Sequence, residues 1–195
     1  IEKQLSRMQE TGREVCYTGA ERIGPDGRLR STMIPEVEGD ARSRTLRGNI
    51  VGPSVLTVSR EAFNTINGFD DDIPFWEDWD FTYRLSGQYQ FTGVREALAK
   101  IHTDADDRRS DAPEKAKRGA QYLIEKHTPI NHRGGRFATR RFKSRLWNGA
   151  GRSALMNGQF GDAQRYFIRA VRQWPFDRSL LLYGGLSLGG DPLLR

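Results

Sequence analysis

The arrangement of apolar and polar positions divides the chain into two parts. Up to about residue 105, short apolar runs alternate with turn signals, which is typical of an α/β arrangement. Beyond that point the apolar residues recur at helical spacing, and the breaks fall at glycine and proline. The pattern predicts an α/β half followed by an all-helical C-terminal extension.

Within the first half, the pattern predicts short helices and short strands. Apolar residues at helical spacing indicate helices ending near residue 10, over 60–65 and over 79–85. Apolar runs rich in β-branched and aromatic residues indicate strands over 13–23, 50–58 and 89–102. The Gly-Pro-Asp-Gly sequence at 24–27 is a strong turn signal. The pattern determines no conformation for the loop at 31–47.

In the second half, residues 106–136 are expected to form a helix and a linker, and 137–195 a helical hairpin extension. Helices are predicted over 111–127, 137–157, 160–174 and 178–188, with a break at 128–135. The region 144–177 resembles one tetratricopeptide repeat through Trp147, Gly151, Gly158, Ala163, Phe167, Ala170 and Pro175. Ala154 stands where that repeat usually has a large aromatic residue, so a generic helical hairpin is the alternative.

Composition narrows the protein class. The net charge of +6 and the pI near 9.7 predict an anionic partner, such as nucleic acid, a phosphate-bearing substrate or acidic lipid. A mean hydropathy of -0.69 and the lack of a long apolar run argue against a membrane span. The single cysteine, Cys16, cannot form an internal disulfide, which favours a reducing cytoplasm.

The acidic stretch at 67–86, NGFDDDIPFWEDWDFTYRLS, is the strongest candidate for chemistry. Its carboxylates could bind Mg²⁺ or Ca²⁺, although the regular spacing of a calcium loop is missing. They could also cap the helix that follows, because the helix dipole stabilises negative charge at its N-terminus. A third interpretation is a catalytic base: Trp76 and Trp79 flank Glu77 and Asp78, and an apolar setting tunes a carboxylate for that role.

The stretch from Gly48 to Ser86 resembles the acceptor-side half of the family-two inverting glycosyltransferases. The family's usual run is a Gly-Asn strand, a Gly-Gly-Phe-Asp-Glu turn and then Glu-Asp-Trp-Asp. The matching residues here are Gly48, Asn49, Ser54, Phe63, Gly68, Phe69, Asp70, Glu77, Asp78, Trp79, Asp80, Arg84 and Leu85. Asn67 replaces the first glycine of the turn. The resemblance covers residues 1–105 and implies part of a GT-A fold, a nucleotide-binding α/β sandwich.

The resemblance implies roles for individual residues. Asp78 would be the catalytic base that takes the proton of an acceptor hydroxyl. Glu77, Trp76, Trp79 and Asn49 would bind the acceptor, with a position in the core as the alternative for Trp79.

Three further residues carry expectations. Asp80 would cap the helix, and Arg84 would pair with an acid one turn earlier. His102 would help to bind a metal or the diphosphate, although a structural role is the alternative.

The resemblance also implies partners outside this sequence. A nucleotide-sugar donor would be held by an N-terminal half with an Asp-x-Asp motif that binds Mg²⁺ or Mn²⁺, and neither is expected within these residues. The chain is thus interpreted as the C-terminal part of a metal-dependent transferase that builds polysaccharide or another cell-envelope glycan, on a glycan or lipid-linked acceptor. The alternative is a non-catalytic helical-repeat interaction protein with a degenerate transferase remnant.

The basic run at 132–145, HRGGRFATRRFKSR, is a second candidate surface. A solvated basic helix face is the plainest interpretation. Attraction to an anionic membrane surface is the functional one, which would place the protein peripherally at the inner face of the cell membrane. Arginines interleaved with Phe137 and Phe142 could also bind RNA, but no nucleic-acid fold motif accompanies them, so nucleic acid is the less favoured partner.

Overall fold

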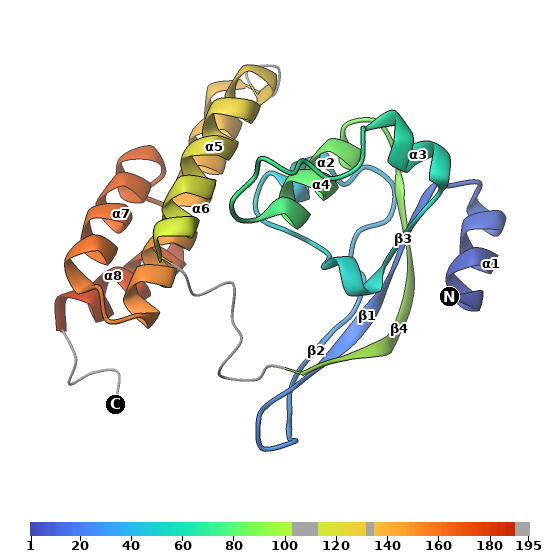
Figure 1. Cartoon of the computed structure of the whole chain (residues 1–195), viewed down its shortest axis with the longest axis horizontal. Helices are drawn as coiled ribbons and strands as arrows, with labels where there is room; N and C mark the ends of the chain where they lie inside the picture. Colours follow the sequence, from blue (N-terminus) through green and yellow to red (C-terminus); the bar gives the residue numbers. More distant parts are fainter. Residues whose placement is uncertain (103–112, 132–134, 190–195) are drawn as a thin grey trace. The chain divides into compact units, whose positions relative to one another are not determined.

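The computed structural model describes residues 1–102, 113–131 and 135–189 (Figure 1). These residues form two compact units, each described here by itself. An α/β unit contains residues 1–70 and 77–102, and a helical unit contains residues 71–76, 113–131 and 135–189. The predicted α/β class is confirmed by a mixed four-stranded sheet. The predicted domain boundary near residue 105 lies outside the described residues.

The sheet of the α/β unit is built around β1, Val15–Ile23. Strand β4, Phe91–His102, runs parallel to β1 along its whole length. Strands β3, Leu56–Val58, and β2, Leu29–Met33, are both antiparallel to β1. Because β4 occupies one side of β1, the two short strands share the other side, β3 beside the first half of β1 and β2 beside the second.

Gly19 lies where the pairing of β1 changes register. A Cβ atom there would come within 2.3 Å of the Met33 carbonyl oxygen and 2.9 Å of the Glu96 carbonyl oxygen. Only glycine allows the neighbouring backbones to approach so closely. Gly19 therefore permits β1 to pair with a strand along each of its edges.

Two helix ends of the α/β unit show the capping that their sequences predict. Helix α1, Glu2–Thr11, ends at the left-handed Gly12, and helix α3, Arg60–Thr65, begins where the Ser59 hydroxyl accepts the Ala62 N–H. Helix α4, Glu77–Ser86, begins two residues earlier than its apolar spacing predicts. The short helices α2, Arg42–Thr45, and η1, Pro53–Val55, were not predicted, and the expected strand over 50–58 is reduced to β3.

The core of the α/β unit joins these helices to the sheet. Its buried residues are Val15, Tyr17, Ala20, Val37, Ala41, Val51, Val55, Ala62, Ile66, Phe81, Leu85 and Phe91. Phe81 and Leu85 stand four residues apart and so lie on one face of α4, which fixes the rotation of that helix over the core. The residues of α4 that carry candidate chemistry are therefore held in a defined orientation.

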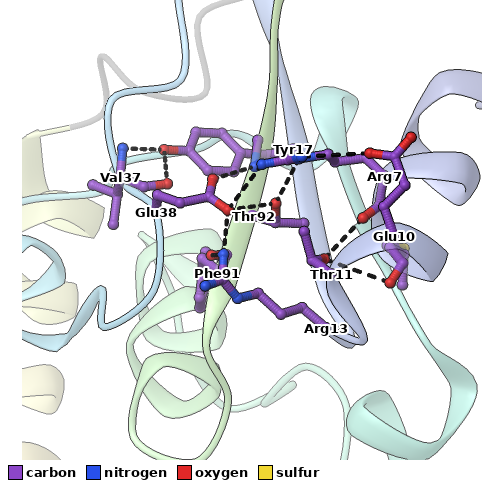
Figure 2. A network of polar contacts seen from close by, with 11 residues as sticks. Arg7, Glu10, Thr11, Arg13, Tyr17, Val37, Glu38, Phe91 and Thr92 are labelled. Atoms are coloured by element: carbon purple, nitrogen blue, oxygen red, sulfur yellow. Dashed lines mark hydrogen bonds and ion pairs between the residues drawn. The ribbon is translucent and has the colours of Figure 1, made fainter.

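A polar network around Glu38 attaches the loop before α2 to β4 (Figure 2). The Glu38 carboxylate accepts from the Thr92 hydroxyl at 2.8 Å and the Gly93 N–H at 3.2 Å. It also receives the guanidinium groups of Arg13 and Arg7. Beside it, Gly39 and Phe91 exchange two backbone hydrogen bonds. The network fixes the loop that leads into α2.

The helical unit contains α5, Pro113–Asn131, α6, Gly135–Met156, α7, Phe160–Gln173, and α8, Arg178–Gly189 (Figure 1). Helix α5 continues through residues 128–131, which the sequence assigned to a break. Residues 132–134 of that predicted break lie outside the described residues. None of the described helices is both long and apolar enough to cross a membrane.

Helices α6 and α7 pack closely through a small residue. The buried Phe167 ring lies over Gly151, where a Cβ atom would approach the ring to 2.6 Å. The rings of Trp147 and Tyr166 stack beside this contact, with centroids 5.8 Å apart. The contact accounts for the glycine and phenylalanine positions in the expected hairpin, while its assignment as a tetratricopeptide repeat stays a prediction.

Residues 71–76 lie in sequence between two segments of the α/β unit but belong to the helical unit. Phe75 packs on Gly119 of α5, and Trp76 packs on Gly149 of α6. A Cβ atom at Gly149 would lie 2.7 Å from the Trp76 ring, so the indole lies directly on the helix backbone. The division of the acidic stretch between two units was not predicted from the sequence.

Candidate functional site

The candidate site is the first turn of α4, where three acids gather: Glu77, Asp78 and Asp80. A helix N-terminus has free N–H groups and a positive dipole end, so carboxylates are favourable there. One Asp78 oxygen, Oδ1, accepts the Trp79 backbone N–H at 2.7 Å. The residue before the helix, Trp76, has a left-handed backbone with φ of 66°, which is uncommon for a bulky side chain. The chain thus makes a strained turn directly ahead of these acids.

Asp78 is held by residues from two segments of the α/β unit. Its second oxygen, Oδ2, accepts a hydrogen bond from Asn49 Nδ2 at 2.8 Å. The Asn49 amide is itself oriented, because Asn49 Oδ1 accepts the Thr82 hydroxyl at 3.0 Å. Thr82 stands four residues after Asp78, one helical turn along α4. The three side chains form a connected set in which Asp78 is the only ionisable member.

The pKa of Asp78 is raised above its ordinary value. Burial is the main cause, and the negative charge of Glu77 adds to it. The hydrogen bonds from the Trp79 N–H and from Asn49 act in the opposite direction but do not outweigh burial. A carboxylate with a raised pKa binds a proton more readily than an ordinary aspartate, which is the property a general base requires.

The start of α4 is anchored by Thr45, which lies in the segment 31–47 whose conformation the sequence did not predict. The buried Trp79 donates its indole N–H to the Thr45 carbonyl oxygen at 2.6 Å, and the Thr45 hydroxyl lies 2.8 Å from the Ser86 hydroxyl. Trp79 is only 6% exposed, so it has no open ring face for a sugar. Its burial favours the core position given as the alternative, and we do not retain Trp79 as an acceptor-binding residue.

Asp80 and Arg84 fix the turn before α4 to the helix. Asp80 is fully buried, and its carboxylate accepts from Arg84 Nε at 2.7 Å, which is the expected pairing one helical turn apart. The same guanidinium donates to the carbonyl oxygens of Ile66 and Gly68. Asn67 and Gly68 both have left-handed backbones, a conformation that asparagine tolerates better than most residues. The replacement of the family's first glycine by Asn67 is therefore compatible with this turn.

Of the remaining predicted site residues, only Glu77 adjoins this set. Glu77 is exposed at the start of α4, beside Asp78 in sequence. Trp76 belongs to the helical unit, where it packs on Gly149, and its role in acceptor binding stays a prediction. His102 is exposed at the end of β4, opposite Ile23. In the part of the chain that the structure describes, no three histidine, cysteine, aspartate or glutamate residues are grouped to hold a metal ion. A metal role for His102 stays a prediction.

A cavity of about 550 Å³ lies elsewhere in the α/β unit, between α1 and β4. Its lining is Glu2, Lys3, Ser6, Arg7, Glu10, Gly93, Val94, Arg95 and Glu96. Charges of both signs line it, and Lys3 pairs with Glu96. None of the residues around Asp78 lines this cavity, so it does not bear on the candidate site.

Two residues of the site were missed by sequence reasoning. Thr82 orients Asn49, and Thr45 anchors Trp79, yet neither carries a charge or a ring that would single it out. The signal available for Thr82 was its spacing of four residues from Asp78, which places both on one side of α4. No protein-family model and no curated protein sequence matches this chain.

Proposed function

We propose that this chain supplies the acceptor-activating part of an inverting glycosyltransferase, with Asp78 as the general base. The observation that carries the proposal is the setting of Asp78: a carboxylate with a raised pKa, hydrogen-bonded through both oxygens and oriented by Asn49. The resemblance of residues 48–86 to the family-two enzymes gives that carboxylate its role. The proposed fold is correspondingly the acceptor half of a GT-A domain.

The proposed reaction is a single displacement at the anomeric carbon of a nucleotide-activated sugar. The acceptor oxygen forms a bond to that carbon as the bond to the diphosphate breaks, and the configuration inverts. The nucleoside diphosphate leaves with the bonding electron pair. Asp78 takes the proton of the acceptor hydroxyl, which makes the oxygen a better nucleophile as it attacks.

Asn49 and Glu77 have supporting roles in this proposal. Asn49 Nδ2 donates to Asp78 Oδ2, so it sets the direction of the carboxylate. Glu77 is exposed beside Asp78, where its carboxylate can accept hydrogen bonds from sugar hydroxyl groups. The donor, Mg²⁺ or Mn²⁺ and a glycan or lipid-linked acceptor remain implied by the resemblance alone.

A second candidate function is an interaction protein without catalysis. Its support is the close contact of α6 and α7 through Gly151 and Phe167, which builds a helical hairpin of the kind that repeat proteins stack. In that case the Asp78 set would be a structural remnant. The two candidates differ in what they require of the Asp78 carboxylate.

The test is sugar transfer by the full protein encoded by the gene, with Asp78→Asn as the variant. Asparagine keeps the size of the side chain but cannot take the proton. The protein is incubated with a panel of nucleotide sugars, Mg²⁺ or Mn²⁺, and a membrane and glycan extract, and nucleoside diphosphate release is measured. We expect Asp78→Asn to lower release by about 10²–10⁴-fold, the usual contribution of a general base.

Asp71→Asn is the matched control. Asp71 is an exposed acid of the preceding turn, and its substitution removes the same charge as Asp78→Asn. It should leave release unchanged. Circular dichroism of both variants would establish that each is folded. Release that is equal in the wild type and Asp78→Asn, or that is absent with every nucleotide sugar, would contradict the proposal and favour the interaction protein.

A further inference from the structure

The helical unit has an exposed aromatic cluster where α6 begins and α7 ends. Phe137 is 73% exposed and Phe176 is 79% exposed. Both rings meet Trp174 edge to face, with centroids 6.3 Å and 5.5 Å from the indole. Phe137 comes from α6, and the other two follow the last residue of α7, so the fold gathers them from separate segments. Clustered exposed aromatic side chains indicate an interaction surface.

Arginines surround these rings. The Arg141 guanidinium lies over the Trp174 ring, 5.7 Å from its centroid. Arg140 donates to the carbonyl oxygens of Gln173 and Arg172 at 2.9 and 3.1 Å, which holds the end of α7 against the start of α6. Arg136 and Arg172 are exposed next to Phe137 and the end of α7. We call this set the arginine–aromatic surface: Arg136, Phe137, Arg141, Arg172, Trp174 and Phe176.

In α6 and α7 the one acid, Asp162, pairs with Arg165 near the start of α7, away from this surface. Helix α6 carries six arginine and lysine residues and no acid, so the whole helix is positive. The acid that follows Phe176, Asp177, is buried, and its carboxylate pairs with Arg145 at 3.1 Å. An anionic partner is therefore the electrostatic complement of this surface.

We propose that the arginine–aromatic surface binds an anionic membrane surface, with Phe137 and Phe176 inserted among the lipids and the arginines at the headgroups. Exposed phenylalanine next to arginine suits this boundary, because the ring enters the apolar region while the cation meets anionic headgroups. Trp174 would lie at the interface, where indoles are favoured. This inference rests on the helical unit and does not depend on the proposed function.

Ring geometry favours lipid over single-stranded RNA. Base stacking needs an open aromatic face. Here the three rings meet edge to face, with interplanar angles of 82° and 76°, and Arg141 covers one face of Trp174. The two most exposed rings, by contrast, present apolar area that insertion would remove from water. RNA binding is thus the outcome that the experiment must separate from lipid binding.

The experiment measures co-sedimentation of the full protein with two kinds of vesicle. One kind is phosphatidylcholine alone, and the other contains about one-third phosphatidylglycerol, which gives the anionic surface that attracts clustered arginines. We expect binding to the anionic vesicles only. Binding should weaken between about 0.1 M and 0.5 M salt, because salt screens exposed charges.

Two double variants separate the charge from the rings. Arg136→Glu/Arg172→Glu should weaken vesicle binding by more than about 25-fold, since each cation near such a membrane contributes about fivefold. Phe137→Ala/Phe176→Ala should weaken it by about tenfold or more through lost apolar burial. The second effect should persist at high salt, because it does not arise from charge.

The matched controls are Lys115→Glu/Arg118→Glu and Met156→Ala. The first makes the same change in charge at exposed positions near the start of α5, and the second removes an exposed apolar side chain at the far end of α6. Both should bind vesicles as the wild type does. Circular dichroism would check that every variant is folded.

Three results would overturn the proposal. The first is no difference between the two kinds of vesicle. The second is an equal loss of binding in the surface variants and in their controls. The third is tight binding of a single-stranded RNA oligonucleotide that depends on Phe137 and Phe176 while anionic vesicles are not bound, which would assign the surface to RNA.

Discussion

Glu38 and Asp78 are both carboxylates of the α/β unit, yet their surroundings shift their pKa values in opposite directions. Burial opposes ionisation of both. At Glu38 the Thr92 hydroxyl, the Gly93 N–H, Arg13 and Arg7 outweigh it, and the pKa is lowered (Figure 2). At Asp78 the Asn49 amide and two backbone N–H groups, those of Trp79 and of Asp78 itself, do not outweigh burial, and the pKa is raised.

The difference lies in the charged neighbours. Glu38 has two arginines beside it and serves to fasten a loop to β4. Asp78 has another acid beside it, Glu77, and the main groups that shift its pKa, which are Glu77, Asn49 and two backbone N–H groups, carry no positive charge. A carboxylate that stabilises the fold is thus surrounded by cations, whereas one that can accept a proton is kept away from them.

The largest effect is expected at a third carboxylate, the buried Asp80. Replacing Arg84 by alanine leaves the Asp80 charge buried without its guanidinium and frees the carbonyl oxygens of Ile66 and Gly68. Removing one partner of a buried ion pair costs about 3–5 kcal/mol. Urea denaturation should show a loss of this size in the free energy of unfolding.

The matched double variant is Arg84→Ala/Asp80→Asn. It removes the buried charge as well, so it should recover part of the stability lost in Arg84→Ala. A loss below about 1 kcal/mol in Arg84→Ala would mean that the Asp80–Arg84 pair stabilises the fold no more than an ordinary surface ion pair does.

The next effect is expected at Glu38. Glu38→Gln removes the charge that Arg7 and Arg13 contact, and it should lower the free energy of unfolding by about 1–2 kcal/mol, since a side chain that is 47% exposed is partly screened. The folded pKa lies below the unfolded one, so the stability from Glu38 is present above the unfolded pKa. It is lost as pH falls through the folded pKa.

Denaturation of the wild type and of Glu38→Gln at several pH values checks this sign. The difference between the two proteins should be full at neutral pH and should shrink as pH falls through the folded pKa of Glu38. Glu36→Gln is the control, because Glu36 is also exposed and pairs with a single arginine, Arg44. A difference that grows on acidification would contradict the lowered pKa.

The sequence predicted the elements of the α/β unit better than their connections. Helix α3 was predicted over 60–65, and the structure places it at Arg60–Thr65, with the Ser59 hydroxyl as its N-cap. Strand β2 was missed because its residues are mostly exposed, so it has no apolar alternation to detect. Helix α2 was missed for a related reason: its four residues are too few to show a helical period.

Within the candidate site, the sequence could identify Asp78 but not its setting. The acids and the following helix are visible in the sequence, and so was the pairing of Arg84 one turn from Asp80. The sequence did not show that Trp76 and Trp79 belong to different units, because the packing of each ring depends on contacts with distant residues. Trp79 is fixed by Thr45, 34 positions earlier, and Trp76 by Gly149, 73 positions later.

The third effect is expected to have the opposite sign from the first two. The raised pKa of Asp78 means that its charged form is costly in the folded protein, so Asp78→Asn should leave stability unchanged or raise it by up to about 1 kcal/mol at neutral pH. The gain should disappear as pH falls below the unfolded pKa of aspartate, where Asp78 is protonated in both states.

Thermal unfolding of the wild type and Asp78→Asn at neutral and acidic pH tests this. Asp71→Asn, at an exposed position, should change stability less at either pH. A clear loss of stability in Asp78→Asn at neutral pH would mean that the carboxylate stabilises the fold as Glu38 does, and the contrast between the two would fail.

The smallest effect is expected at Asn49. Asn49→Ala removes the Nδ2 donor 2.8 Å from Asp78, and this hydrogen bond is one of the contributions that lower the Asp78 pKa. The pKa of Asp78 should therefore rise further, as followed by NMR titration of its carboxyl carbon. The rise should be modest, because Asn49 is exposed and water can take the place of its amide. Asn64→Ala, at an exposed position of α3, is the control and should not move the titration. A fall in the pKa would mean that water stabilises the carboxylate better than the amide does. Asn49 would then serve to keep water from Asp78 as well as to orient it, and the raised pKa would depend on that exclusion.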